Sequence, residues 1–285
     1  MQLHAPAPEQ IALDVARALC EDIGSGDASA ALLPDSARSA RSAHIVCREH
    51  AVVAGLPWVE ACIRTLDPQA RFEWSVGDGQ QIAPGTVLGL IHAHSAALVT
   101  AERSALNFLQ TLSATATTTA RHVAAVATVP GSRLRILDTR KTLPGLRLAQ
   151  KYAVRCGGGH NHRIGLHDAI MLKENHILAA GSITAAVASA RQRFPALPLI
   201  CEVENLDELQ QALDAAVDRV LIDNFTVQDM QRAVALAAGR IPLEVSGNVS
   251  LETLPQIAAT GVDFVSIGAL TKHVQAIDYS MRLLA

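Results

Sequence analysis

Basic residues crowd one short stretch of this 285-residue chain, between Arg133 and Lys173. The 41 residues of that stretch hold nine lysines and arginines but only two acids, which gives a local charge of +7. The whole chain, by contrast, has a net charge of −3. Arginine binds carboxylates and phosphates through its planar fork, and lysine attracts them as a point charge. The stretch therefore predicts a site that holds an anion.

These basic residues form two groups that have different interpretations. Three of them are spaced four residues apart, as on the exposed face of a helix: Arg147, Lys151 and Arg155. Four others stand at predicted strand or loop ends, where a solvated helix face does not account for them: Arg140, Lys141, Arg163 and Lys173. We assign the anion site to these four. Nucleic acid is disfavoured as the anion because Tyr152 is the only aromatic residue in the stretch.

The second half of the chain predicts a parallel α/β barrel. Short apolar runs typical of buried parallel strands recur every 20 to 35 residues, with helical segments such as 207–216 and 227–238 between the later ones. The predicted strands are Leu134–Asp138, Ala169–Lys173, Leu199–Val203, Arg219–Asp223, Leu243–Ser246 and Phe264–Gly268. This spacing matches βα units with short loops. A doubly wound sheet is the alternative, but no GxGxxG or phosphate-loop motif supports a nucleotide crevice.

Polar, charged or glycine residues follow nearly every predicted strand. The carboxyl ends of barrel strands form the active site, so we expect these residues to meet in one place. Glu202 and Asp223 stand at successive ends, and two carboxylates beside a polyanionic substrate predict a Mg²⁺ site. Ser246-Gly247-Asn248 and Gly268-Ala269 follow the last two strands, where many barrels bind phosphate through backbone N–H groups.

The first half of the chain has a different pattern. An amphipathic helix is predicted at residues 8–23, and a long helix rich in alanine and threonine at about 96–127. Between them lie a predicted helix at Leu56–Leu66 and short strands at Ala43–Cys47, Phe72–Val76 and Val87–Ala93. The length of the chain fits one large domain or two ordinary ones.

Composition excludes several classes of protein. Hydrophobic residues make up 49% of the chain and charged residues 18%, which rules out a disordered protein. No apolar run approaches the roughly 18 residues of a membrane helix, and residues 1–10 lack the basic region of a secretory signal. The five scattered cysteines have no zinc or CxxC spacing, as expected of free thiols in a reducing compartment. We therefore expect a cytoplasmic protein that binds neither membranes nor nucleic acid.

Histidines and cysteines near the basic stretch have simpler interpretations than metal binding or nucleophilic catalysis. His160, His162 and His167 have a spacing that is poor for zinc on a helix, and no fourth ligand is nearby. We interpret His162 as a ligand contact, and His160 and His167 as loop surface. Cys156 and Cys201 lack a histidine–acid arrangement, so we expect buried structural thiols.

Seven motifs in order span almost the whole chain: 102–108 (ERSALNF), 137–145 (LDTRKTLPG), 156–163 (CGGGHNHR), 172–176 (LKENH), 202–204 (EVE), 246–248 (SGN) and 268–271 (GALT). Together they resemble the quinolinate phosphoribosyltransferase family, also called carboxylating nicotinate-nucleotide pyrophosphorylases. The second and third motifs are specific to that family. The resemblance implies that quinolinate and phosphoribosyl pyrophosphate give nicotinate mononucleotide, pyrophosphate and CO₂, a step of NAD biosynthesis.

The resemblance also implies roles for individual residues. The quinolinate carboxylates would be held by Arg103, Arg140, His162, Arg163 and Lys173. Lys141 would face the diphosphate and ribose, and Glu202 and Asp223 would hold Mg²⁺ and the ribose hydroxyls. The 5-phosphate would be bound by Ser246, Gly247, Asn248, Gly268 and Ala269. The residues expected to act in catalysis are Lys141, Lys173, Glu202 and Asp223.

Fold and assembly follow from the same resemblance. It implies an N-terminal α/β sandwich domain, residues 1–115, which the C-terminal tail 270–285 joins. It implies an open seven-stranded parallel α/β barrel at residues 116–269. It also implies a homodimer, or a higher oligomer, in which Arg103 acts in the partner's site.

Two other functions stay open. A Schiff-base aldolase on a similar barrel would use Lys173 as its nucleophile, although Glu174 follows that lysine directly. A repurposed paralogue of the same fold, such as those associated with molybdate transport, is expected to lose the quinolinate-binding arginines, and this chain keeps all three. Borohydride trapping and a quinolinate assay separate these alternatives from the main prediction.

Overall fold

The computed structural model describes residues 3–32 and 39–284; residues 1–2, 33–38 and 285 lie outside the described ranges. The chain forms two compact units. Unit 1 comprises residues 1–120, 142–158 and 270–285, and unit 2 comprises residues 121–141 and 159–269. None of the helices in the described ranges combines the length and the apolar character that a membrane span requires.

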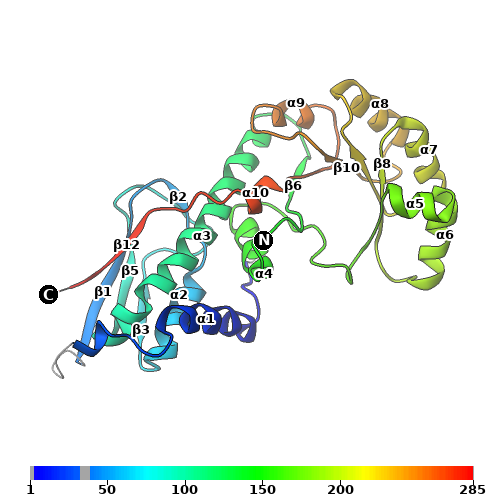
Figure 1. Cartoon of the computed structure of the whole chain (residues 1–285). Helices are drawn as coiled ribbons and strands as arrows, with labels where there is room; N and C mark the ends of the chain where they lie inside the picture. The colour runs from blue at the N-terminus through cyan, green and yellow to red at the C-terminus, as the bar shows by residue number, and fades with distance from the viewer. Residues whose placement is uncertain (1–2, 33–38, 285) are drawn as a thin grey trace. The chain divides into compact units, whose positions relative to one another are not determined.

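Unit 1 is built on an antiparallel sheet with the strand order β12-β1-β5-β3 (Figure 1). Its strands are β1 (Ala40–Cys47), β3 (Arg71–Trp74), β5 (Val87–His94) and β12 (Tyr279–Leu283). Its helical segments are α1 (Pro8–Ile23), η1 (Ala30–Leu32), α2 (Leu56–Leu66), α4 (Arg147–Cys156) and most of α3 (Ser95–Ala127). A separate two-stranded ladder joins β2 (Ala51–Val52) and β4 (Gln81–Ile82). Because β12 pairs with β1, the last strand of the chain completes the sheet of the first unit.

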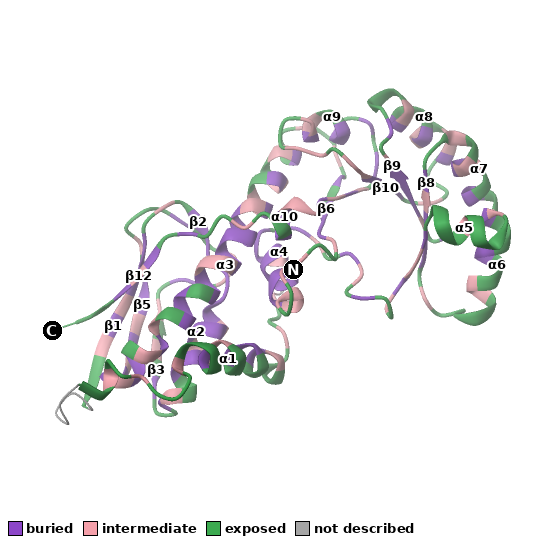
Figure 2. Ribbon diagram, viewed as in Figure 1, coloured by how far each residue is buried: buried purple, intermediate pink, exposed green. Residues whose placement is uncertain are grey.

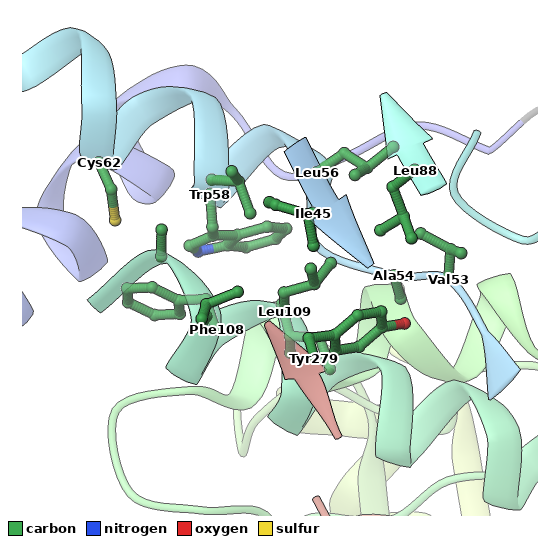
Figure 3. Close-up of a cluster of buried hydrophobic side chains, with 14 of the residues drawn as sticks. Ile45, Val53, Ala54, Leu56, Trp58, Cys62, Leu88, Phe108, Leu109 and Tyr279 are labelled. Carbon is green, nitrogen blue, oxygen red and sulfur yellow. The ribbon is translucent and has the colours of Figure 1, made fainter. Parts of the chain in front are cut away.

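A cluster of buried side chains fills unit 1 between its sheet and its helices (Figure 3). The apolar face of α1 buries Ile11, Val15 and Leu19, as its amphipathic pattern predicts. Trp58 of α2 is fully buried, and its indole N–H donates to the buried Asp14 Oδ2 at 3.1 Å. This bond satisfies both buried polar groups, so the cluster includes them at little cost.

Asp78 fixes the start of α2 and attaches α4 to unit 1. Its carboxylate accepts the backbone N–H groups of Gly55 at 3.0 Å and Leu56 at 3.2 Å, which are among the free N–H groups at the start of a helix. It also accepts the hydroxyl of Tyr152, on α4, at 2.8 Å. The sequence-based division kept residues 142–158 with the barrel, whereas these contacts hold α4 in unit 1.

Helix α4 carries three of the basic residues of the charged stretch, and the exposed helix face that the spacing predicted for part of them is wrong for Lys151. Lys151 has only 3% of its surface exposed. Arg147 and Arg155 are half-buried, and the Arg155 guanidinium donates to the carbonyl of His4. A spacing of four residues places side chains on one helix face, but it does not say whether another part of the protein covers that face. Here the face is covered at least in part, because Lys151 is buried and Arg155 contacts the His4 backbone.

Unit 2 is built on a parallel sheet of six described strands in the order β6-β11-β10-β9-β8-β7. These are β6 (Arg135–Leu137), β7 (Ile170–Leu172), β8 (Leu199–Val203), β9 (Arg219–Asp223), β10 (Leu243–Ser246) and β11 (Phe264–Ser266). The helices that alternate with them are α5 (Glu174–Ala180), α6 (Ile183–Arg193), α7 (Leu206–Asp214), α8 (Val227–Ala237) and α9 (Leu254–Ala258), and α10 (Ala269–Lys272) follows β11. Figure 2 shows helices α6 to α8 along the outside of the sheet, with buried residues toward the strands.

A short segment around His160 extends this sheet beyond β6. His160 and Leu137 form an isolated parallel bridge. The His160 N–H donates to the carbonyl of Ile136 at 2.8 Å, and the Asp138 N–H donates to the carbonyl of His160 at 3.1 Å. The predicted assignment of His160 to the loop surface is therefore wrong, because its backbone completes the hydrogen bonds of an edge strand.

Gly157, at the end of α4, offers a test of the packing in unit 1. A Cβ at this position would lie 2.3 Å from the carbonyl oxygen of Ala116 and 2.7 Å from the Cβ of Thr119, both on α3. Because backbone must move to relieve the overlap, Gly157→Ala is expected to lower the free energy of unfolding by about 3 kcal/mol. Urea unfolding measures this. Gly77→Ala is the control, since that position has open space, and equal stabilities of the two variants would contradict the prediction.

Candidate active site

A cavity of about 280 Å³ opens in unit 2 at the carboxyl ends of its strands. The residues that line it come from the segments after β6 and after the His160 bridge, from β7 and the residue after it, and from β8, β9, β10 and β11. Seven residues of the predicted site are among them: Arg140, Lys141, His162, Arg163, Lys173, Glu202 and Ser246. The structure therefore brings four basic side chains to one place, as the strand-end pattern predicts.

Asp138, the residue after β6, anchors the segment that carries His162 and Arg163. It is fully buried, and its carboxylate accepts the backbone N–H of His162 at 2.9 Å and the side-chain amide of Asn161 at 2.5 Å. A buried carboxylate is costly unless bonds of this kind satisfy it. Asp138 thus ties the end of β6 to the bridge segment, and Arg140 and Arg163 reach the same cavity.

Arg163 is held in the wall of the cavity by the loop that follows it. Its Nη1 donates to the carbonyl of Ala169 at 3.0 Å, and Asp168 closes the loop by accepting the N–H groups of Ile164 and Gly165 at 2.7 and 2.8 Å. Burial lowers the pKa of Arg163, and the positive charge of Arg140 lowers it further, while Asp168 opposes both. Two cations that repel each other in one cavity indicate a place for an anion.

Lys173 and Glu202 form an ion pair across the cavity. The Lys173 Nζ lies 2.5 Å from Glu202 Oε2, and their side chains are 46% and 17% exposed. Lys173 also begins α5, where its backbone N–H donates to His176 Nδ1 at 3.1 Å. An ion pair this exposed contributes little to stability, so its main consequence is to fix where the ammonium group lies.

The remaining strand-end residues of the prediction lie outside the lining of this cavity. These described residues are Asp223, Gly247, Asn248, Gly268 and Ala269. Gly268 nevertheless contacts the site, because a Cβ there would lie 2.7 Å from Cδ of Lys141. The lysine stem therefore packs against the glycine that follows β11.

Arg103 lies on α3, in unit 1, and is exposed. The other residues of the predicted site belong to unit 2. The role of Arg103 therefore stays a prediction that rests on the resemblance.

Glu244 is a cavity residue that the sequence did not single out. It stands in the middle of β10 and is fully buried, with Oε2 3.0 Å from Arg219 Nη1 and 3.3 Å from His162 Nε2. Burial raises the pKa of Glu244, but His162, Ser266 and Arg219 outweigh burial, so the pKa lies below its usual value. The only available signal was a charged residue inside an apolar strand, which by itself does not reveal a partner.

Removing the charge of Glu244 is expected to destabilise the protein at neutral pH. Glu244→Gln should lower the free energy of unfolding by about 3 kcal/mol at pH 7, because Arg219 loses its buried carboxylate partner. A depressed folded-state pKa gives stability that is present above the unfolded pKa and lost as the pH falls through the folded pKa. The difference between wild type and variant should therefore shrink as the pH falls below the usual value, near 4.5.

Urea unfolding at pH 7 and at successively lower pH measures the effect of Glu244→Gln. Glu21→Gln is the matched control, because Glu21 is exposed on α1 and the substitution removes the same charge. The control should unfold like the wild type. Equal stability of Glu244→Gln and wild type at pH 7 would show that the buried carboxylate contributes nothing.

Cys156 and Cys201 are buried structural thiols, as predicted. All five cysteines are free. Burial raises the pKa of Cys156 to about 12 and that of Cys201 to about 11. A thiol with so high a pKa is protonated at neutral pH and is a poor nucleophile.

A larger cavity of about 640 Å³ lies beside α5, α6 and α7, and it does not suit an anion. The described residues that line it include four glutamates and no basic side chain: Glu174, Glu202, Glu204 and Glu208. The smaller cavity, with its converging cations, is therefore the candidate active site.

Comparison with known proteins decides the family. The family model described as "Quinolinate phosphoribosyl transferase, C-terminal domain" matches residues 115–282, and the model "Quinolinate phosphoribosyl transferase, N-terminal domain" matches residues 28–113. The chain belongs to the quinolinate phosphoribosyl transferase family. The resemblance drawn from the seven motifs is thereby confirmed.

Relatives of known sequence and structure agree with this family. A probable carboxylating nicotinate-nucleotide pyrophosphorylase of Synechocystis sp. is 44% identical over 93% of this chain and 90% of the relative. Its counterpart in Bacillus subtilis is 38% identical over 92% of this chain and 89% of the relative. The solved structure of the nicotinate-nucleotide pyrophosphorylase from Francisella tularensis superposes with a TM-score of 0.94 and 42% identity, over 100% of this chain and 99% of that one.

Proposed function

We propose that this member of the quinolinate phosphoribosyl transferase family transfers the phosphoribosyl group of phosphoribosyl pyrophosphate to quinolinate. Nicotinate mononucleotide, pyrophosphate and CO₂ are the products, and the reaction is a step of NAD biosynthesis. The observation that carries this proposal is the convergence of Arg140, Lys141, Arg163 and Lys173 on one cavity. Both substrates are polyanions, and the convergence of arginine and lysine suits carboxylates and phosphates.

Quinolinate would bind through its two carboxylates. Arg140, Arg163 and Lys173 supply positive charge on the cavity walls, which His162 also lines, and Arg103 is proposed to add a further arginine. Holding the pyridine ring by its carboxylates aims the ring nitrogen, a weak nucleophile, at the ribosyl carbon. Positioning of this kind supplies much of the catalysis of a reaction between two bound molecules.

Phosphoribosyl pyrophosphate would lie along the strand ends. Lys141 is proposed to face the diphosphate, and the 5-phosphate to bind the segments after β10 and β11: Ser246, Gly247, Asn248, Gly268 and Ala269. As the bond from C1 of ribose to the diphosphate breaks, positive charge develops on the ribosyl ring and negative charge on the leaving group. A lysine fixed beside that leaving group stabilises the negative charge as it forms.

Decarboxylation follows from the same geometry. Once the ring nitrogen has bonded to the ribosyl carbon, the pyridine ring is cationic. The bond between the ring and the adjacent carboxylate then breaks, its electron pair passes into the cationic ring, and CO₂ leaves. The ring carbon takes up a proton to give nicotinate mononucleotide.

We propose Glu202 and Asp223 as ligands of Mg²⁺. Glu202 pairs in register with Leu221, and Asp223 stands two residues beyond Leu221 on the same face of β9, so alternation directs both carboxylates to one side of the sheet. The described residues include no group of three or more metal-binding side chains, so phosphate oxygens and water would complete the shell, as is usual for Mg²⁺. When bound, the ion would offset charge on the departing diphosphate.

Metal dependence is a direct test of those ligands. Activity is expected to require Mg²⁺ or Mn²⁺, and Glu202→Ala or Asp223→Ala should lower activity about 100-fold or more and weaken its dependence on the metal. Asp214→Ala, at an exposed position near the end of α7, is the control and should retain both. Full activity in excess chelator would reject the assignment.

The family also implies a barrel, domain bounds and a dimer for this chain. We infer an open barrel of seven strands, in which the bridge at His160 is the seventh strand beside β6 and β7 is the opposite edge. We also propose an N-terminal domain at residues 1–115 with the tail 270–285, and a barrel domain at 116–269 apart from α4. We propose that the protein forms a homodimer in which Arg103 serves the partner's site, and that its location is cytoplasmic. The five free cysteines support a reducing compartment.

The Schiff-base alternative lacks support from the site. A lysine that forms an imine must lose its proton, which requires a desolvated or cationic environment. Lys173 instead is partly exposed, and its amine is engaged in an ion pair with Glu202 at 2.5 Å. No trapping by borohydride with a carbonyl substrate is expected.

A single assay tests the proposed function. Purified protein is mixed with quinolinate, phosphoribosyl pyrophosphate and Mg²⁺, and quinolinate is followed by its absorbance. Equal amounts of nicotinate mononucleotide, pyrophosphate and CO₂ should appear as quinolinate disappears. No consumption of quinolinate by folded protein would overturn the proposal.

A further inference from the structure

Strands β9 and β10 end side by side, and an asparagine in an unusual conformation follows each end. Asp223, the last residue of β9, pairs with Ser246, the last residue of β10. Asn224 comes next on one strand with φ 56°, and Asn248 stands two residues beyond the other with φ 49°. Left-handed backbone is uncommon for residues other than glycine and marks positions that the surrounding structure determines.

Asn224 connects the two strand ends through four separate contacts. Its backbone N–H donates to the carbonyl of Ser246 at 3.1 Å. Its side-chain amide donates to Asp223 Oδ2 at 2.8 Å, and its Oδ1 accepts the amide of Asn248 at 3.4 Å. The same Oδ1 fills the space beside Gly247, where a Cβ would lie only 2.2 Å from it.

These contacts explain why Gly247 is a glycine. Its φ of 89° suits glycine, and the Asn224 side chain occupies the place that any other side chain would need. The loop Ser246–Asn248 therefore rests directly on Asn224, while the other end of the same amide holds the Asp223 carboxylate. One short side chain spans the two groups.

We propose that Asn224 is a positioning residue that holds the Asp223 carboxylate and the loop Ser246–Asn248 at a fixed spacing for phosphoribosyl pyrophosphate. The inference rests on the proposed function, in which Asp223 meets the ribose and metal end of this substrate and the loop meets its 5-phosphate. A substrate bound at two points gains affinity when both points are already in place, because no ordering is needed on binding. Asn224 supplies that order without touching quinolinate.

A purely structural role for Asn224 is a separate interpretation with a different expectation. The Asn224 side chain is exposed, and hydrogen bonds at exposed positions contribute little to stability. Helix α8 does not depend on it, because Thr226 caps that helix through its own side chain. Loss of the Asn224 amide should therefore change the affinity for substrate much more than the free energy of unfolding.

Asn224→Gly is the deciding variant, since glycine adopts the left-handed backbone freely and removes only the side-chain contacts. Asn224→Asp keeps the shape and Oδ1 but replaces the donor to Asp223 with a second negative charge. Calorimetry on the full-length protein, with Mg²⁺ present, measures the affinity for phosphoribosyl pyrophosphate and for quinolinate separately. Both variants should bind phosphoribosyl pyrophosphate at least about 10-fold more weakly, and quinolinate within about 2-fold of wild type.

Ala238→Gly is the matched control. Ala238 is also a non-glycine residue in left-handed backbone, with φ 45°, at the end of α8, and glycine relaxes it in the same way. Ala238→Gly should bind both substrates with the affinity of the wild type. Urea unfolding should give all three variants a free energy of unfolding within about 0.5 kcal/mol of that of the wild type.

Three outcomes would overturn the inference, and they can be told apart. Wild-type affinity of Asn224→Gly for phosphoribosyl pyrophosphate would show that the amide positions nothing. Equal weakening of both substrates, or loss of stability, would show a general structural role. Wild-type protein that binds neither substrate would overturn the proposed function, and the inference with it.

Discussion

Nicotinate is expected to be turned over at least about 100-fold less efficiently than quinolinate, as judged by kcat/KM, because it lacks one of the two carboxylates. Arg140 and Arg163 line the same cavity, and burial together with Arg140 lowers the pKa of Arg163. A substrate with one carboxylate forms fewer ion pairs with these arginines than a substrate with two. The loss of one such ion pair at a partly buried site costs about 3 kcal/mol, which corresponds to the expected ratio.

Steady-state kinetics with each acid at saturating phosphoribosyl pyrophosphate measures the ratio. Arg163→Met should lower kcat/KM for quinolinate toward the value for nicotinate and so narrow the discrimination. Arg133→Met is the control, because Arg133 is exposed and does not line the cavity. Comparable kcat/KM values of the wild type for the two acids would refute a site built for two carboxylates.

The strands of unit 2 show which parts of a fold a sequence can predict. The predicted bounds of β8, β9 and β10 agree with the structure to the residue. These strands lie in the middle of the sheet, where apolar runs are uninterrupted, and turn residues bound each run. Strands β6 and β7 are shorter than predicted by one residue at each end, and β11 ends two residues before its predicted end.

Other elements depend on partners that are distant in the chain. The strand β12 completes the sheet of unit 1 through pairing with β1, more than 200 residues earlier, and the local sequence around Tyr279 carries no sign of that partner. The bridge at His160 likewise consists of a few backbone hydrogen bonds to β6, with no apolar run. Periodicity predicts which face of an element is apolar, but it does not predict whether another segment covers the polar face. Lys151 is an example, because it lies on a polar helix face and is nevertheless buried.

In the candidate site, too, some residues could be predicted from the sequence and others could not. The strand-end rule brought Arg140, Lys173 and Glu202 to one cavity because it depends only on the direction of parallel strands. Asp138 and Glu244, which both contact His162 in the wall of the cavity, are single acids whose partners come from other segments of the chain. Such contacts are set by side-chain packing in three dimensions, so sequence reasoning found the charges and missed their supports.

An equimolar mixture of two inactive variants, Arg103→Ala and Lys141→Ala, is expected to recover about a quarter of wild-type activity once their subunits exchange. The expectation follows from the proposed dimer, in which each site takes Arg103 from the partner and Lys141 from its own barrel. Random pairing makes about half of the dimers mixed, and each mixed dimer then has one doubly defective site and one intact site.

The same mixture separates action in trans from action in cis. If Arg103 serves the site of its own chain, every site in every dimer carries one defect and no activity returns. Exchange is achieved by unfolding the variants together and refolding them, and a tag on one variant shows that mixed dimers have formed. Refolding each variant alone is the control and should give no activity. A mixture that exchanges subunits yet stays inactive would place Arg103 outside the partner's site and refute its action in trans.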